Sequence, residues 1–181
     1  MKNEHTTKNE EHHWTSEEKL KWLGYGEWVE ELDSIEIEYL GYEAIVIRVL
    51  QREPFSKVES YFGGNFCAHV RIPENHPLYG SKEIDIDCHG GINLNEFHEE
   101  HWIGFDCAHA IDYIPTFELK IKQHKELFPI PKGLENSHFF TPVYRNMQYC
   151  IDECKKIIDQ LINDTEKWEE IKQSKKKSIN S

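Results

Sequence analysis

The most constraining feature of this 181-residue chain is an apolar stripe near its C-terminus. Between residues 144 and 161, apolar side chains recur every three or four positions, as they do on one face of an α-helix. The stripe consists of Tyr144, Met147, Ile151, Cys154, Ile158 and Leu161. A helix with one apolar face must bury that face against another element, so this segment requires a partner layer.

The partner layer is predicted by strand patterns earlier in the chain. Residues 35–50 combine alternation with an apolar run around a turn at Gly41, which indicates two strands. Three further strands are predicted over 66–72, 84–88 and 101–106, with 61–65 as a loop and a short helix over 118–127. If residues 107–112 start a helix, Asp106 would cap it. We therefore predict an α+β domain, in which a long C-terminal helix packs on a mixed or antiparallel sheet.

The length suits one domain, with a polar segment at each end. We predict flexible tails at residues 1–14 and 166–181 and a single domain over residues 15–165. Thr15 or Ser16 is expected to cap a first short helix.

The composition excludes several classes of protein. A formal net charge of -12 argues against binding extended nucleic acid, which requires clustered Lys and Arg. No apolar run is long enough for a membrane span, and the polar N-terminus does not resemble a secretory signal. Five cysteines, an odd number, indicate free thiols in a reducing compartment. We therefore expect a cytoplasmic protein, whose oligomeric state the composition does not predict.

The residue types best suited to chemistry lie in one window, from Cys88 to Asp112. His89 and His109 follow predicted strands at glycine-marked turns, and Asp106 and Asp112 lie three residues to either side of His109 in the sequence. A buried Asp–His pair fixes an imidazole tautomer and raises its basicity. The predicted catalytic residues are therefore His89 and His109, as proton-handling or phosphate-contacting groups, with Asp106 and Asp112 orienting them.

A set of ligand-binding residues is predicted around these histidines. Gly90 and Gly91 allow close approach of the backbone, and their amides can point at an anion. Arginines supply positive charge, and we expect Arg145, next to Tyr144, to face a cleft at the start of the last helix. The predicted ligand-binding residues are Gly90, Gly91, Arg71, Tyr144 and Arg145.

Other chemistries fit the same window. A transition metal is an alternative, because the ligand types suit one, although no spacing is diagnostic of a particular metal or cofactor. The candidate ligands are Cys88, His89, Asp106, Cys107, His109 and Asp112. Nucleophilic catalysis by Cys107 is disfavoured, because the flanking carboxylate would raise its thiol pKa. A capping aspartate beside a core histidine is the purely structural alternative.

Three motifs resemble a family of short, largely uncharacterised proteins encoded by bacterial phages and prophages. The motifs are His-Gly-Gly at 89–91, Gly-Phe-Asp-Cys-Ala-His-Ala-x-Asp at 104–112 and Tyr-Arg-x-Met-x-Tyr at 144–149, with His-Pro-Leu-Tyr-Gly at 76–80 belonging to the same pattern. The resemblance covers roughly residues 60–160. It implies a protein of the host bacterial cytoplasm that is accessory to replication or structure, with interference in host defence as one role for such proteins.

These observations lead to one principal hypothesis and two alternatives. The principal hypothesis is a phage-type cytosolic protein that binds a small anionic nucleotide-like ligand. One version of this hypothesis adds hydrolysis of the bound ligand. The first alternative is a metal-dependent hydrolase. The second is an acidic inhibitor that blocks a host protein by charge complementarity, in which case the His–Asp cluster is structural.

Overall fold

The computed structural model describes residues 13–54, 59–97, 100–123, 142–164 and 167–170. Its strands are β1 (Ser34–Tyr39), β2 (Tyr42–Arg52), β3 (Tyr61–Ile72), β4 (Leu94–Phe97) and β5 (His101–Asp106). Its helices are α1 (Ser16–Leu23), a 3-10 turn at Glu27–Val29, α2 (Pro115–Gln123) and α3 (Met147–Asn163).

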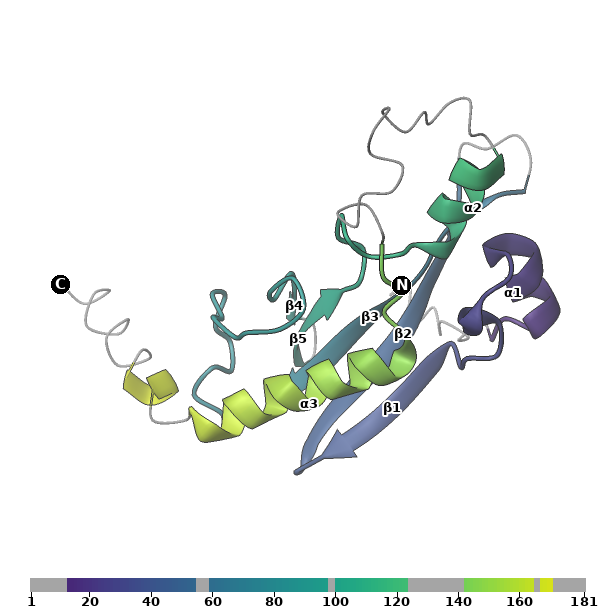
Figure 1. The fold of residues 1–181 in the computed structure, drawn as a ribbon. Coiled ribbons are helices and arrows are strands. Elements are labelled where there is room, and N and C mark those ends of the chain that lie inside the picture. The colour runs from purple at the N-terminus through teal and green to yellow at the C-terminus, as the bar shows by residue number, and fades with distance from the viewer. Residues whose placement is uncertain (1–12, 55–58, 98–99, 124–141, 165–166, 171–181) are drawn as a thin grey trace, which may run out of the picture.

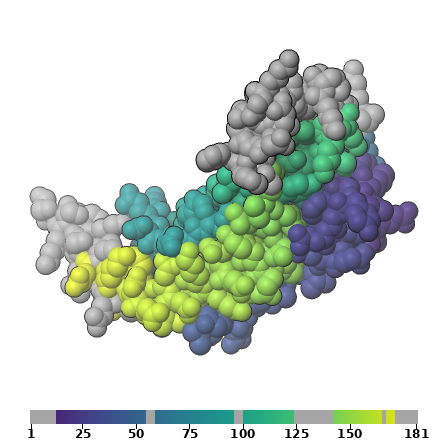
Figure 2. All heavy atoms as spheres, viewed as in Figure 1, coloured from purple at the N-terminus to yellow at the C-terminus, as the bar shows by residue number. Residues whose placement is uncertain are grey.

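The strands form one antiparallel sheet in the order β1-β2-β3-β5-β4, and α3 crosses one of its faces (Figure 1). The predicted α+β class, with a long C-terminal helix on an antiparallel sheet, is confirmed. Figure 2 shows α3 along one face of the molecule, with the N-terminal segment in purple beside its first turns.

The core lies between α3 and the sheet, as the apolar stripe requires. Its fully buried side chains include Val46, Phe66, Val70, Ile103 and Phe105 from the strands, and Cys150, Cys154, Ile157, Ile158 and Leu161 from α3. Burial of one such aliphatic side chain contributes about 1.5–3 kcal/mol, which explains why the helix is held against the sheet. Within the described residues, no helix is both long enough and apolar enough to cross a bilayer.

The prediction of a loop at 61–65 is wrong, because these residues begin β3. The glycine pair that suggested a loop instead forms a bulge. The partner of Val49 is Asn65 and that of Leu50 is Gly63, so Gly64 is the extra residue. Both glycines have positive φ, at 118° and 93°. Thr116 in α2 bonds both backbone groups of Gly63, which fixes α2 to this end of the sheet.

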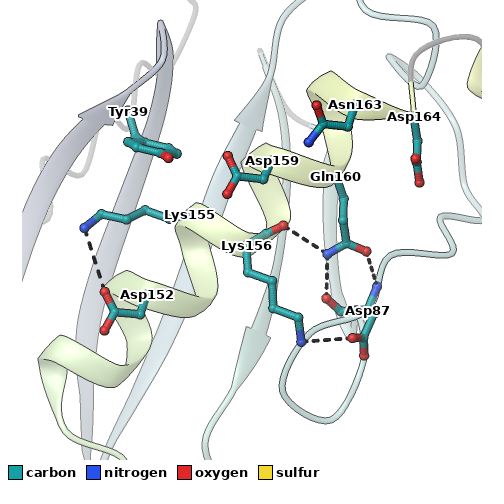
Figure 3. Close-up of a pocket in the computed structure, with 9 residues that line it drawn as sticks. All are labelled: Tyr39, Asp87, Asp152, Lys155, Lys156, Asp159, Gln160, Asn163 and Asp164. Carbon is teal, nitrogen blue, oxygen red and sulfur yellow. Dashed lines mark hydrogen bonds and ion pairs between the residues drawn. The ribbon is translucent and has the colours of Figure 1, made fainter.

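The predicted strand at 84–88 is also wrong, because this segment pairs with α3 and not with a strand. The amide of Asp87 donates to Gln160 Oε1 at 2.9 Å, and its carbonyl accepts from Gln160 Nε2 at 2.7 Å. Lys156 binds the Asp87 carboxylate at 2.9 Å (Figure 3). The side chain of one glutamine therefore replaces a neighbouring strand.

Two further local predictions differ from the structure. The edge strand β4, which follows Gly91 in the chain and pairs with β5, was not among the predicted strands. Residues 107–112 form a turn and not the start of a helix, since the amide of Asp112 bonds the carbonyl of His109 at 2.9 Å. The short helix α2 begins at Pro115, three residues before the predicted position.

Packed residues lie within both predicted tails. The amide of Trp14 donates to Asp33, and its ring contacts Tyr61 with centroids 5.0 Å apart. Trp168, beyond the predicted domain end, is 1% exposed and belongs to the core. Residues 1–12, 166 and 171–181 of the predicted tails lie outside the described residues.

Candidate functional site

The carboxylate of Asp112 is the centre of the candidate site. Its Oδ2 lies 2.8 Å from Nε2 of His89 and 3.2 Å from Nδ1 of His109, and it also accepts the His109 amide at 3.0 Å. Its Oδ1 accepts Nε of Arg145 at 3.1 Å. The Asp112 side chain is 1% exposed, so nearly all of its capacity for hydrogen bonds is met by protein groups. Four predicted site residues therefore meet at one carboxylate.

The loop that carries His89 is held in place by α3. The amide of His89 donates to Glu153 Oε2 at 2.7 Å, next to the Asp87–Gln160 contacts on the same helix. The amide of Gly91 closes a turn on the carbonyl of Cys88 at 3.0 Å. A carboxylate of the protein itself therefore binds the amide of His89, and the amide of Gly91 is used by the turn.

A glycine at position 90 is required by the packing of His109. A Cβ atom at Gly90 would lie 2.1 Å from Cε1 and 2.2 Å from Nε2 of the His109 ring, and φ of Gly90 is +67°. Any larger residue would displace the imidazole. The close approach brings the rings of His89 and His109 to a centroid distance of 5.0 Å.

Asp112 is positioned by a second segment that is distant in sequence. It forms a parallel bridge with Val143, whose amide donates to the carbonyl of Ile111 at 2.9 Å. The carbonyl of Val143 accepts the amide of Tyr113 at 2.9 Å. This pairing joins the turn after β5 to the residues just before α3, which explains why Arg145 reaches Asp112.

The electrostatics of Asp112 determine where the hydrogens lie. Burial would raise the pKa of its carboxyl, but hydrogen bonds from His89, the His109 amide and Arg145 outweigh burial and lower it. The carboxylate is therefore ionised at neutral pH and can only accept, so the ring nitrogens of both histidines that face it donate. In a neutral His109, Nε2 is then an acceptor on a side chain that is 34% exposed.

Tyr149 is a site residue that the sequence analysis missed. Its hydroxyl lies 3.0 Å from Nδ1 of His89, and its ring lies beneath the guanidinium of Arg145 at 4.8 Å. The side chain of His89 is 8% exposed, and it is held between Asp112 and Tyr149. The signal for this residue was its place at the end of the Tyr-Arg-x-Met-x-Tyr motif, four residues after Arg145.

Three predicted site residues are not brought to the cluster. Asp106 accepts from Asn93 at 2.6 Å and from the amide of Ala108 at 2.9 Å, so the prediction that it orients a histidine is wrong. Arg71 pairs with Glu43 and Glu100 (2.8 and 2.7 Å). Tyr144 belongs to a separate buried network, in which its hydroxyl donates to Glu31 and accepts from Arg48.

The cysteines of the window lie beneath the site, in the core. Cys107 is 1% exposed, and its Sγ lies 3.6 Å from that of Cys150. This sulfur contact, together with burial, raises the pKa of the Cys107 thiol. Burial also raises the pKa of Cys88 to about 11. Both thiols are therefore protonated at neutral pH, which removes Cys107 as a nucleophile.

Comparison with known proteins supplies no identity for this arrangement, since no family model, curated protein or solved structure matches the chain. The arrangement is therefore interpreted from its chemistry. Within the described part of the chain, His89, His109 and Asp112 form the single group of three or more ligating side chains whose donor atoms lie within 4.8 Å of one another.

Proposed function

We propose that this protein is a metal-dependent hydrolase of a small anionic ligand and that His89, His109 and Asp112 hold the metal. The observation that carries the proposal is the convergence of two imidazole nitrogens and one carboxylate oxygen within 4.8 Å of one another. In a tetrahedral site with bonds of about 2.0–2.1 Å, neighbouring donors lie about 3.3 Å apart. The distances from Asp112 Oδ2 to the two histidines are 2.8 and 3.2 Å.

The ligand set fits a catalytic ion better than a structural one. Two histidines and one carboxylate are three protein ligands, which leave a coordination position for water or substrate. Zn²⁺ accepts these ligand types, as do Fe²⁺ and Mn²⁺. Binding would replace the two ring hydrogens that face Asp112, and each neutral imidazole would then carry its hydrogen on the other ring nitrogen.

The groups around the three ligands also suit a metal. Ligating histidines ordinarily donate their second ring nitrogen to a fixed partner. For His89 that partner would be the hydroxyl of Tyr149, 3.0 Å from Nδ1. Asp112 is held by Arg145 through its other oxygen, Oδ1. Each of these contacts orients a ligand without occupying the donor atom that faces the cluster.

A metal in this site would supply a nucleophile at neutral pH, because coordination lowers the pKa of bound water to about 7. In ester hydrolysis, the oxygen of that water bonds to the acyl or phosphoryl centre. The bond to the leaving alcohol breaks, and the alcohol takes the proton that the water loses. A role in the host cytoplasm against defence signalling, which the phage resemblance implies, stays a prediction.

The test is metal binding by full-length protein purified without a histidine tag. All titrations use a His12→Gln, His13→Gln background, so that the adjacent N-terminal histidines do not bind the probe. We expect Zn²⁺ or Mn²⁺ to bind with a stoichiometry of one. His109→Ala should abolish binding, whereas the control His69→Gln, on β3, should leave it unchanged.

Activity is then measured on a panel of phosphate and carboxylate esters. Chelator should abolish turnover, and restored metal should recover it. Absence of metal binding in the folded parent would overturn the proposal. A stable complex with a host protein, without metal binding or turnover, would favour the acidic inhibitor instead.

A further inference from the structure

The guanidinium of Arg145 lies beside the proposed metal site, and with the described residues it uses only part of its donor set. Its Nε donates to Asp112, and its plane lies over the ring of Tyr149. The side chain is 20% exposed. Among the described residues, neither Nη1 nor Nη2 has a hydrogen-bond partner. An arginine fixed in this way presents a planar pair of N–H groups, which matches the oxygens of a phosphate.

The backbone beneath Arg145 is anchored on both sides. The hydroxyl of Tyr144 donates to Glu31 Oε2 at 2.6 Å, and the amide of Met147 donates to Oε1 of the same residue at 3.2 Å. The side chain of Asn146 caps α3 by accepting the amide of Tyr149 at 3.0 Å. The Tyr-Arg-x-Met-x-Tyr motif is thus explained: its first tyrosine fixes the backbone, and its last supports the guanidinium and His89.

The charges select among anions. With a divalent cation bound and both imidazoles neutral, one carboxylate and one guanidinium leave the site with a net charge of plus two. A phosphomonoester carries about −1.5 to −2 at pH 7, and a phosphodiester carries one negative charge. The rest of the chain is strongly acidic, with a formal net charge of -12, so an anion is attracted only by this local charge.

We propose that Arg145 and the metal together form a subsite for the terminal phosphate of a phosphomonoester. The inference rests on the proposed function, because it needs the ion at His89, His109 and Asp112. Arg145 would bind two phosphate oxygens through its Nη groups, while the ion binds a third oxygen. The diester, with one charge fewer and two oxygens blocked by ester bonds, fits this subsite less well.

The experiment is calorimetry on the metal-loaded, full-length protein with three probes. They are inorganic phosphate, a nucleoside 5′-monophosphate and the corresponding 3′,5′-cyclic monophosphate, which is a diester. We expect the monophosphate to bind at least about tenfold tighter than the cyclic compound. Inorganic phosphate separates recognition of the phosphate itself from recognition of the organic group.

Two substitutions test the role of Arg145. Arg145→Lys keeps the charge but loses the planar fork, and Arg145→Gln loses both, so affinity for monophosphate should fall about tenfold and further still, respectively. Metal affinity and thermal midpoint, measured for each variant, separate loss of phosphate from loss of the ion or of the fold. Arg71→Gln, at an arginine that the fold keeps away from the site, is the matched control and should have no effect.

The outcomes distinguish the two proposals. If metal binds but the diester binds as tightly as the monoester, or both Arg145 variants bind monophosphate like the parent, the phosphate subsite is overturned and the metal site stands. If no metal binds to the folded parent, the proposed function itself fails, and the subsite fails with it.

Discussion

Among the described residues, the buried polar networks centred on Arg48 and on Asp112 differ in how far they are closed. Arg48 has a side chain that is 0% exposed, and each of its three nitrogens donates to an acceptor. The acceptors are the carboxylates of Glu31 and Asp33, the hydroxyl of Tyr144 and the carbonyls of Trp28, Leu32 and Gly64. The Asp112 network, by contrast, opens to solvent through His109 and Arg145, which are 34% and 20% exposed.

The difference separates a structural network from a candidate site. A buried charge is tolerated when all its hydrogen bonds are made, and the Arg48 network makes them with groups from the N-terminal segment, the sheet and the residue before Arg145. Within the part of the chain that the structure describes, the Asp112 network leaves Nε2 of His109 and the Nη groups of Arg145 without a hydrogen-bond partner. We infer that the first network holds the elements in place and that the second is available to a ligand.

The largest expected effect is the loss of stability in Arg48→Met. This substitution removes the charge at the centre of the closed network. It takes one donor each from the carboxylates of Glu31 and Asp33, and it removes the donors that Arg48 supplies to three backbone carbonyls. Loss of one partner from a buried ion pair costs about 3–5 kcal/mol. Urea denaturation should show this loss in the free energy of unfolding.

Arg71→Met is the control for that experiment, because the ion pairs of Arg71 with Glu43 and Glu100 are exposed. Exposed pairs contribute about 0–1 kcal/mol. A similar loss for both variants would mean that the Arg48 network has no special structural role.

The second prediction concerns Gly90→Ala, which acts on the open network. The added Cβ would collide with the His109 ring, so we expect metal affinity to fall about 100-fold, as for misplaced catalytic groups. Gly91→Ala is the matched control. Gly91 also has a positive φ, +82°, but a Cβ there would meet no atom within 4 Å. Equal losses of metal affinity in the two variants would attribute the effect to backbone strain and not to His109.

The third prediction is that Tyr149→Phe lowers metal affinity by less than Gly90→Ala does. The change removes the hydroxyl that bonds Nδ1 of His89 and keeps the ring beneath Arg145. Loss of such an orienting hydrogen bond costs about tenfold in metal affinity, at the lower end of the usual range. Metal titration by calorimetry measures it. An unchanged affinity would show that Tyr149 does not orient a ligand.

The smallest expected effect is that of Asp112→Asn on how the free energy of unfolding changes with pH. The pKa of Asp112 is lower in the folded state than in the unfolded state. Its contribution to the free energy of unfolding is therefore fully present above the ordinary carboxyl pKa, and it is lost as the pH falls through the folded-state pKa. Asp112→Asn should therefore lose less stability than the parent when pH is lowered from 5 to 3. Denaturation curves at each pH give the two slopes, with the exposed Asp85→Asn as control. Parallel slopes for parent and Asp112→Asn would contradict the prediction.

Local sequence patterns were sufficient for the elements with one buried face. The stripe from Met147 to Leu161 predicted α3, and alternation around Gly41 predicted β1 and β2. The patterns failed where tertiary contacts supply the hydrogen bonds. Residues 84–88 alternate like a strand but pair with Gln160, and the glycines at 63 and 64 form a bulge within a strand.

The amino-acid sequence by itself determined which chemical groups are present in the site. It placed His89, His109 and Asp112 in glycine-marked motifs, and Arg145 in the Tyr-Arg-x-Met-x-Tyr motif. Only the tertiary structure decided which of them meet. Asp106 and Asp112 carry the same side chain and belong to the same motif. Yet Asp106 caps its own turn, while Asp112 pairs with Val143 and faces both histidines. Convergence depends on contacts between segments separated by 20 to 60 residues, for which local periodicity carries no signal.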